Sequence, residues 1–431
     1  MKFLPIERGK INICLMKSFA KHILKKIVAF LARHTIKKFT PRIIAVTGSV
    51  GKTSSKEAIC AVLKDFKRVR KSSANFNNEL GVPLTILGSW SSLWKPAFFF
   101  WCWVCVISFV RLIFGSRKKY PEVLVLEYGA DSPGDIGALV DIAKPNIGVI
   151  SSIGALPVHV ENYPLGIDSV VKEKSKIISS LGTADVAILN NDDPQTSRLA
   201  SKTRARVVTF GFLESSDTQL SQVHHVVRER DIEGISCKIS VGGSTIPLMI
   251  QDAFSISHLY AAACGVSVGQ VMGINGVEAV QAITKYYMPL SGRSVLVRGI
   301  KNTYIIDESY NSSPIAVETA LATLRGIKGF RKIAILGDML ELGDFAIQAH
   351  EAIGALVPES LDILITVGLR AKFIAQEAQK RGMKKDAVYV CETAQQVGAI
   401  IQNIIKEGDL ILIKGSRKIG LDAVVEEVRS L

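Results

Sequence analysis

The feature that most constrains the fold is a glycine-containing turn between a short apolar run and a helical stretch. The turn, Thr47-Gly48-Ser49-Val50-Gly51-Lys52-Thr53, follows Ile43–Val46 and precedes Ser54–Leu63. A strand, a glycine turn and a helix in this order place backbone N–H groups around an anion at the positive end of the helix. A lysine then reaches the terminal phosphates and a hydroxyl binds Mg²⁺. Val46 stands where the usual phosphate loop has its first glycine. We predict a phosphate site formed by Gly48, Ser49, Val50, Gly51, Lys52, Thr53 and Ser54.

The rest of the chain alternates strand-like and helical patterns, which predicts an α/β fold with mostly parallel sheets. In the first half the expected strands are 43–46, 123–126, 147–150 and 186–189. Residues 206–250 alternate in polarity and predict an antiparallel addition. Pro289–Gly292 marks a boundary, beyond which strands are expected at 303–306, 332–336, 363–367, 387–390 and 410–413. We therefore predict a central phosphate-loop ATPase domain over 41–292 and a C-terminal Rossmann-like domain over 293–431.

The first 40 residues are strongly basic. They hold ten Lys or Arg and one acid, Glu7, and so carry +9 of the formal charge of +14. Residues 11–39 read as an amphipathic helix whose apolar positions include Ile23, Ile27 and Leu31. Lysines interrupt the apolar stretch, which argues against a secretory signal. Such a helix lies either on an anionic membrane surface or against the protein's own body. No nucleic-acid module is recognisable, so we predict no nucleic-acid partner.

A second unusual segment is the hydrophobic insertion at 90–119. Its apolar run is near the lower limit of the about 20 residues that a membrane-spanning helix needs. Residues 47–83 and those from 127 onward must meet in one site, so a single crossing would separate them. The run ends at Arg117–Lys119, and five aromatics lie within 98–103, as is typical of a membrane interface. We predict an interfacial hairpin, with a buried core helix as the alternative. The seven dispersed cysteines indicate a reducing compartment and no disulfide framework.

Several runs together resemble the Mur ligase family, and in particular its D-alanyl-D-alanine-adding branch. The resemblance extends from about Pro41 to Leu431 and rests on T-G-S-V-G-K-T-S at 47–54, N-F-N-N-E-L-G-V-P at 75–83, L-E-Y-G-A at 126–130, D-E-S-Y-N-S-S-P at 307–314, L-G-D-M-L-E-L-G at 336–343 and K-G-S-R at 414–417. It implies a central ATPase domain with a C-terminal domain that closes on it, and an ADP-forming ligase that uses ATP and Mg²⁺. The family's N-terminal domain, which binds the UDP end of the sugar substrate, has no counterpart here, where the basic helix takes its place.

The resemblance also assigns roles to particular residues. Thr53, Glu127 and His159 would bind Mg²⁺, and Glu127 ends a strand, where sites gather in open α/β sheets. Lys174 matches the lysine that the family carbamylates, although Lys176 stands where the family has Glu. Catalytic roles are therefore expected for Lys52, Glu127, His159 and Lys174.

Further assignments concern the nucleotide and the two substrates. Arg293 would approach the phosphates and Asp307 the ribose. The family's His and second Asn before the small-residue helix at 257–268 fall at Ala253 and Ser257, which predicts a changed adenine contact. The substrate side is expected to comprise Asn77, Asn78, Tyr310, Asn311, Lys414, Ser416 and Arg417.

The leading hypothesis is an ATP-dependent amide ligase acting through an acyl phosphate, with a muramoyl-peptide carboxylate and D-Ala-D-Ala as substrates. The alternatives are a Mur-type ligase for another poly-amino-acid or a lipid-linked substrate, and a membrane-associated nucleotide-binding relative without catalysis. We expect a cytoplasmic protein bound peripherally to the inner face of the plasma membrane.

Overall fold

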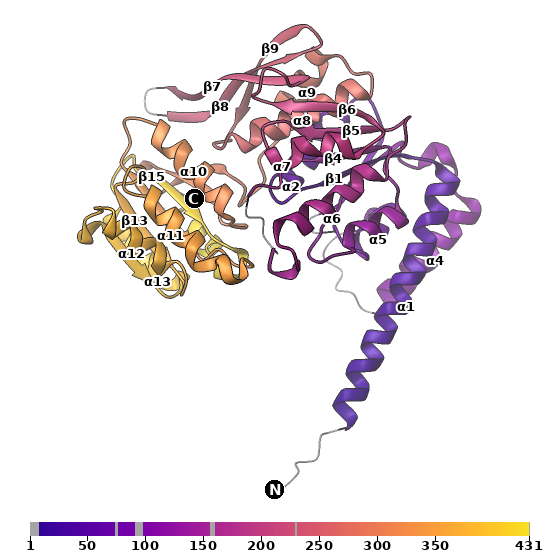
Figure 1. Ribbon diagram of the computed structural model, residues 1–431, viewed down its shortest axis with the longest axis horizontal. Coiled ribbons are helices and arrows are strands. Elements are labelled where there is room, and N and C mark those ends of the chain that lie inside the picture. The colour runs from indigo at the N-terminus through magenta and orange to yellow at the C-terminus, as the bar shows by residue number, and fades with distance from the viewer. Residues whose placement is uncertain (1–7, 74–75, 91–97, 156–159, 229–230, 431) are drawn as a thin grey trace.

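Two β-sheets, each covered by helices on both faces, form the body of the protein (Figure 1). The computed structural model describes residues 8–73, 76–90, 98–155, 160–228 and 231–430. The predicted α/β class, with a mostly parallel central sheet and a second α/β unit, is confirmed.

The first sheet has the strand order β2-β3-β1-β4-β5-β6-β7-β8-β9. It is parallel from β2 to β7 and antiparallel from β7 to β9. Residues 206–211, predicted to begin the antiparallel addition, instead form β6, which pairs in parallel with β5. The strands are β1 (Arg42–Thr47), β2 (Val69–Lys71), β3 (Val123–Glu127), β4 (Ile147–Ile150), β5 (Val186–Asn190), β6 (Arg206–Gly211), β7 (Thr218–Arg228), β8 (Asp231–Val241) and β9 (Ser244–Gln251).

Alternate residues of the central strands face opposite helical layers. In β1, Ile44 and Val46 face α2 (Lys52–Leu63), α8 (Ser257–Val271) and α9 (Gly276–Tyr286). Ile43 and Ala45 face the other layer, which contains α1 (Arg8–Phe39), α3 (Gly81–Leu87), α5 (Asp135–Ile142) and α6 (Ile167–Ser179). Burial on both faces explains why these strands are almost wholly apolar.

The second sheet has the order β10-β11-β15-β12-β13-β14, and only β10 runs antiparallel to its neighbour. Its strands are β10 (Val295–Gly299), β11 (Thr303–Glu308), β12 (Lys332–Gly337), β13 (Ile363–Val367), β14 (Val388–Cys391) and β15 (Leu410–Lys414). One face is covered by α10 (Pro314–Gly326), α11 (Ala346–Leu356) and α12 (Lys372–Lys380), and the other by α13 (Ala394–Ile404) and α14 (Asp422–Val428). The expected strands of this half are all present, and the edge strand β10 is an addition to them.

The two sheets are joined by backbone as well as by side chains. Ala253 forms an antiparallel bridge with Val295, and the Leu296 amide donates to the Asp252 carbonyl at 2.8 Å. The buried His258 ring contacts the Tyr287 hydroxyl at 2.8 Å, and burial lowers the pKa of His258 to about 4. A neutral imidazole is therefore part of this junction at physiological pH.

The basic N-terminal helix is packed against the body on one face and exposed on another, so the predicted contact with the body is present and the membrane contact stays a prediction. On α1, Val28 and Leu31 are buried against the body, whereas Ile23 and Ile27 are exposed. The expectation of one shared apolar face was therefore wrong, because these residues divide between two faces of the helix. Figure 1 shows the first turns of α1 extending beyond the two sheets.

The described part of the insertion contains one helix, α4 (Phe98–Phe114), followed by the 3₁₀ turn η1 (Arg117–Lys119). Within the described residues, no helix has both the length and the apolar composition required to cross a membrane. The segment leaves and rejoins the body at one place. The Tyr120 hydroxyl donates to the Ile86 carbonyl at 2.6 Å, and Arg111 donates to the Leu87 carbonyl at 2.8 Å.

Candidate active site

The glycine turn is held against the segment after β4. Gly48 has a φ of 150°, and a Cβ there would lie 2.2 Å from the Ser151 hydroxyl, so only glycine fits. The Ser49 amide donates to the Ser152 carbonyl at 2.6 Å. Gly51, with a φ of 84°, starts α2, whose first turn has no side-chain cap. The uncapped N–H groups and the positive end of the helix dipole face the cavity that Thr53 and Ser54 line, as anion binding requires.

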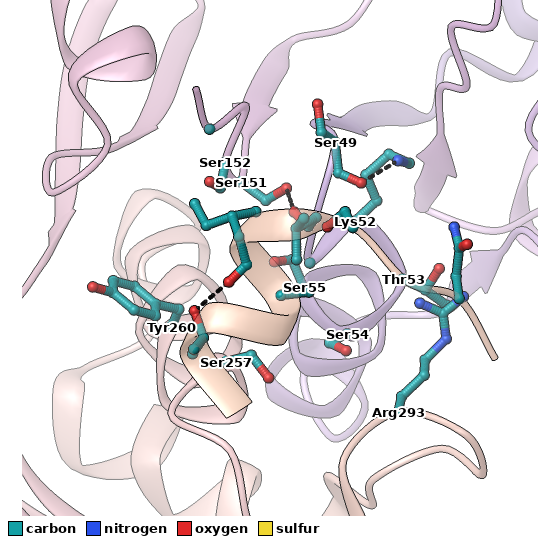
Figure 2. A pocket seen from close by; sticks show the side chains of 18 of the residues that line it. Ser49, Lys52, Thr53, Ser54, Ser55, Ser151, Ser152, Ser257, Tyr260 and Arg293 are labelled. Carbon is teal, nitrogen blue, oxygen red and sulfur yellow. Dashed lines mark hydrogen bonds between the residues drawn. The ribbon is translucent and has the colours of Figure 1, made fainter. Parts of the chain in front are cut away.

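The side-chain nitrogens of two lysines converge on one carbonyl of this turn. Lys52 donates to the Gly48 carbonyl at 2.7 Å and to the Ser49 carbonyl at 3.2 Å, and Figure 2 shows the second of these bonds. Lys174, from α6, donates to the same Gly48 carbonyl at 3.1 Å. Burial lowers the pKa of Lys52, and burial together with the Lys52 cation lowers the pKa of Lys174 to about 7. Lys174 is thus largely a neutral amine at a pH only slightly above neutrality.

A neutral amine reacts with CO₂, so Lys174 is expected to form a carbamate. The protonated amine is inert, so at fixed dissolved CO₂ the carbamate should increase as pH rises from 6 to 8, through the pKa of about 7. Carbon-13 NMR with labelled CO₂ measures this signal. Lys174→Arg should remove it. Lys176→Arg should retain it, because Lys176 is exposed and paired with Glu173 at 2.6 Å. Absence of a Lys174-dependent signal at pH 8 would contradict the prediction.

Glu127 is the centre of a buried polar cluster at the end of β3. Its Oε2 accepts from the Thr53 hydroxyl at 3.0 Å, and its Oε1 accepts from the Asn77 amide at 3.4 Å. Lys56 Nζ lies 3.6 Å from Oε2 and donates to the Ser72 carbonyl at 2.9 Å. Sequence reasoning missed Lys56, although it lies one helical turn beyond Lys52 and Thr53.

Thr53 and Glu127 fit a Mg²⁺ ion. Both present hard oxygen atoms to the cavity, and Mg²⁺ usually takes only one or two protein ligands, with water and phosphate completing its shell. No group of three or more His, Cys, Asp or Glu side chains suited to a metal occurs among the described residues. The third predicted ligand, His159, lies outside the described residues.

The loop before α3 contacts the Glu127 cluster through Asn77, and it packs against the helices α1, α3 and α4 on its other side. Asn77 lines the cavity, but Asn78 does not: its side chain accepts from the amides of Leu80 and Gly81 at 3.1 and 3.0 Å and caps α3. Phe76 and Leu80 pack with residues of α1, α3 and α4, and Lys25 of α1 forms an ion pair with Glu79. The loop that carries Asn77 is thus supported by contacts with α1, α3 and α4.

The second sheet contributes the opposite wall of the cavity. Arg293 and Arg417 lie over the Tyr310 ring, with their guanidinium carbons 4.2 and 5.0 Å from its centroid. In Figure 2 the Arg293 side chain points toward Thr53. Lys414 forms a buried ion pair with Glu308 at 2.8 Å and donates to the Asn311 carbonyl at 3.2 Å. Tyr310, Asn311, Lys414, Ser416 and Arg417 all line the cavity.

Asp307 does not line the cavity. Its two carboxylate oxygens accept from the Gly292 amide at 2.7 Å and from the Ser309 hydroxyl at 2.6 Å, and the residue is buried. In this arrangement Asp307 stabilises the turn that carries Arg293. Its expected contact with ribose stays a prediction. Ser416 also has a structural contact, because its hydroxyl accepts from the Leu340 amide at 2.9 Å.

The cavity continues beyond the glycine turn toward α8. Ser257 and Tyr260 line this end (Figure 2), and the Tyr260 hydroxyl donates to Asp192 at 2.8 Å. Asp193 accepts from the Ser152 hydroxyl at 2.9 Å and from the Gly154 amide at 3.1 Å, which fixes the segment after β4. Ala253 is buried in the bridge to Val295 and does not line the cavity.

One cavity of about 1110 Å³ therefore joins the predicted site residues within the described chain, except Gly48, Asn78 and Asp307. It is large enough for a nucleotide and a second substrate together. Lys52, Thr53, Glu127 and Lys174 line it from the first half of the chain, and Arg293 lines it from the second. Such an arrangement can neutralise a triphosphate and hold a carboxylate beside its terminal phosphorus. Asp131 and Tyr260, which the sequence did not single out, also line it.

Comparisons with known proteins agree with this geometry. The Mur ligase middle domain matches residues 106–264, and the Mur ligase glutamate ligase domain matches residues 292–417. The UDP-N-acetylmuramoyl-tripeptide–D-alanyl-D-alanine ligase of Bacillus subtilis (strain 168) is 30% identical over 402 residues, covering 92% of this chain and 78% of that protein. The ligase of the same name from Synechocystis is 28% identical over 393 residues, covering 91% and 75%.

A solved structure extends the similarity to the backbone. MurF ligase from Thermotoga maritima, in complex with ADP, superimposes with a TM-score of 0.75 at 24% identity, covering 94% of this chain and 83% of that one. At that identity the likeness shows the fold alone. Together with the family matches and the 30% identity to the Bacillus protein, these findings show that the chain belongs to the Mur ligase family.

Proposed function

We propose that this protein is an ADP-forming amide ligase that adds D-Ala-D-Ala to a muramoyl-peptide precursor of the cell wall. The observation that carries the proposal is the shared cavity, in which the uncapped start of α2, Lys52, Glu127 and Lys174 face Arg293 and Tyr310. The names of the relatives from Bacillus subtilis and Synechocystis support the choice of substrates.

The chemistry follows from where the charges lie. A peptide carboxylate oxygen attacks the γ-phosphorus of ATP, which releases ADP and forms an acyl phosphate. The amine of the dipeptide then attacks the acyl carbon, and phosphate leaves with the electron pair of the broken C–O bond. Lys52, the N–H groups of α2 and Arg293 stabilise charge on the transferring phosphoryl group. Mg²⁺, held by Thr53 and Glu127, would supply further neutralisation of the triphosphate.

Product analysis tests this proposal directly. Purified protein with Mg-ATP, a UDP-linked muramoyl tripeptide and D-Ala-D-Ala should yield the pentapeptide and ADP in equal amounts by mass spectrometry. Omitting the dipeptide should remove the pentapeptide. A product only with a lipid-linked tripeptide would identify a lipid-linked donor. Absence of product with either donor and with other amines, while ATP still binds, would contradict the ligase assignment.

We also propose that the ligase works in the cytoplasm, peripherally bound to the inner face of the plasma membrane. The +9 charge of residues 1–40 supports this location, because the cytoplasmic leaflet is anionic. ATP and the muramoyl-peptide are available on that side.

A further inference from the structure

The outward face of α4 consists of apolar side chains. Trp103 is 59% exposed and Phe114 is 81% exposed, although large apolar side chains usually pack. The exposed residues recur at helical spacing, so they form one stripe. We define this stripe, the α4 stripe, as Trp103, Val106, Phe109, Val110, Ile113 and Phe114. A contiguous apolar patch on a folded protein marks an interaction site.

The opposite face of α4 is well packed, which fixes the direction of the stripe. Phe100 and Val104 are buried against Val28 and Leu31 of α1 and against α3. Lys38 of α1 donates to the Leu112 and Ile113 carbonyls at 2.7 and 3.2 Å and so caps the end of α4. On α1, Ile23, Ile27 and Phe30 are also exposed. The stripe thus belongs to a rigid helix pair rather than to a loose segment.

The charge that follows the stripe in the sequence is positive up to Glu122, an acid that pairs with Arg68 at 3.6 Å. Residues 98–121 contain four cations, Arg111 and the three of η1, and no acid. Arg117, Lys118 and Lys119 directly follow the stripe and are exposed, as are Arg33 and Lys37 of α1. Aromatic and aliphatic side chains beside Lys and Arg match the boundary between anionic headgroups and acyl chains. Dimerisation through this surface is less favourable, because residues 98–121 of a second copy contain no acid to pair with these cations.

We propose that the α4 stripe, together with the η1 cations, is the surface that binds an anionic lipid bilayer. The stripe would lie in the interface at the depth of the headgroup–acyl boundary, with Arg117–Lys119 on the lipid phosphates. This inference deepens the proposed location of the ligase by naming its contact surface. Its test measures binding alone, so failure of the ligase assay would not affect it.

Flotation of the full chain with vesicles tests the proposal. Vesicles rich in phosphatidylglycerol should bind the protein, and pure phosphatidylcholine vesicles should bind it more weakly. The triple variant Trp103→Gln/Phe109→Gln/Ile113→Gln should bind anionic vesicles at least about tenfold more weakly, because three apolar side chains no longer enter the lipid. Replacing Arg117, Lys118 and Lys119 by Gln should reduce the preference for the anionic lipid. All these positions are on the surface, and circular dichroism checks that each variant folds.

A matched control replaces three exposed apolar residues elsewhere. Leu213→Gln/Leu369→Gln/Val390→Gln removes similar exposed apolar side chains and should leave vesicle binding unchanged. Equal binding by the α4-stripe variant and the unmodified protein would overturn the proposal. Failure of the unmodified protein to bind anionic vesicles would also overturn it, and a dimer that the α4-stripe variant abolishes would then show that the stripe joins two copies.

Discussion

Replacing Lys52 with alanine is expected to lower kcat/KM for ligation by about 10²–10³-fold, the loss typical of one donor to a developing oxyanion. Lys52 lies at the start of α2, lines the cavity and holds its ammonium at the Gly48 and Ser49 carbonyls. The change removes positive charge where the phosphoryl group is transferred. A coupled assay of ADP release, together with mass spectrometry of the product, measures the loss in kcat/KM.

Lys67→Ala is the matched control, because Lys67 is exposed just after the same helix. It should retain activity within about twofold, since surface changes away from special contacts have small effects. Ligation by Lys52→Ala at the unmodified rate would show that the glycine turn does not hold the reacting phosphate.

The second large effect concerns stability. Lys414→Met is expected to destabilise the C-terminal unit by about 3–5 kcal/mol, because it leaves Glu308 as an unpaired buried carboxylate. The two side chains are only 4% and 7% exposed and lie 2.8 Å apart. The double variant Lys414→Met/Glu308→Leu should recover most of the loss, since neither charge then remains. Thermal unfolding of the four proteins in a double-mutant cycle measures the coupling.

Lys418→Met, an exposed neighbour, should leave the unfolding temperature nearly unchanged. If Lys414→Met unfolds at the temperature of the unmodified protein yet loses activity, Lys414 acts on substrate and contributes little to folding. If the double variant is less stable than either single variant, the ion pair stabilises the fold beyond mere charge compensation.

The sequence predicted the sheets well because the signal is local. Apolar runs such as Ile147–Ile150 and Leu410–Ile413 are buried on both faces, so no polar alternation obscures them. Short edge strands gave weaker signals: β2 has only three residues, and β10 carries Arg298. The gathering of Lys52 and Glu127 followed from their positions at the start of a helix and the end of a parallel strand. Lys174 lies in the middle of α6, and only the family resemblance placed it in the site.

The sequence did not predict which polar side chains accept hydrogen bonds from nearby backbone amides. Asp307 and Asn78 belong to runs shared with the family, yet their oxygens are used by local amides. Hydrogen-bond partners within a turn depend on its φ and ψ angles, which residue spacing does not specify. Lys176, which the resemblance marked as a second cation near Lys174, pairs with Glu173 three residues earlier, a spacing that could have revealed it.

The insertion at 90–119 leaves the body and rejoins it at one place, which affects how such a segment can be gained or lost. Contacts of Tyr120 with Ile86 and of Arg111 with Leu87 already bring its two ends together. The strands β2 and β3, which flank the insertion in the chain, therefore keep the same connection points whatever the number of residues in the insertion. Doubling a flexible segment costs only about 0.6 kcal/mol in loop-closure entropy. Closure of the ends therefore adds little to the cost of a longer insertion, and the main constraint on its divergence is that it keeps the buried contacts of Phe100 and Val104 with α1 and α3.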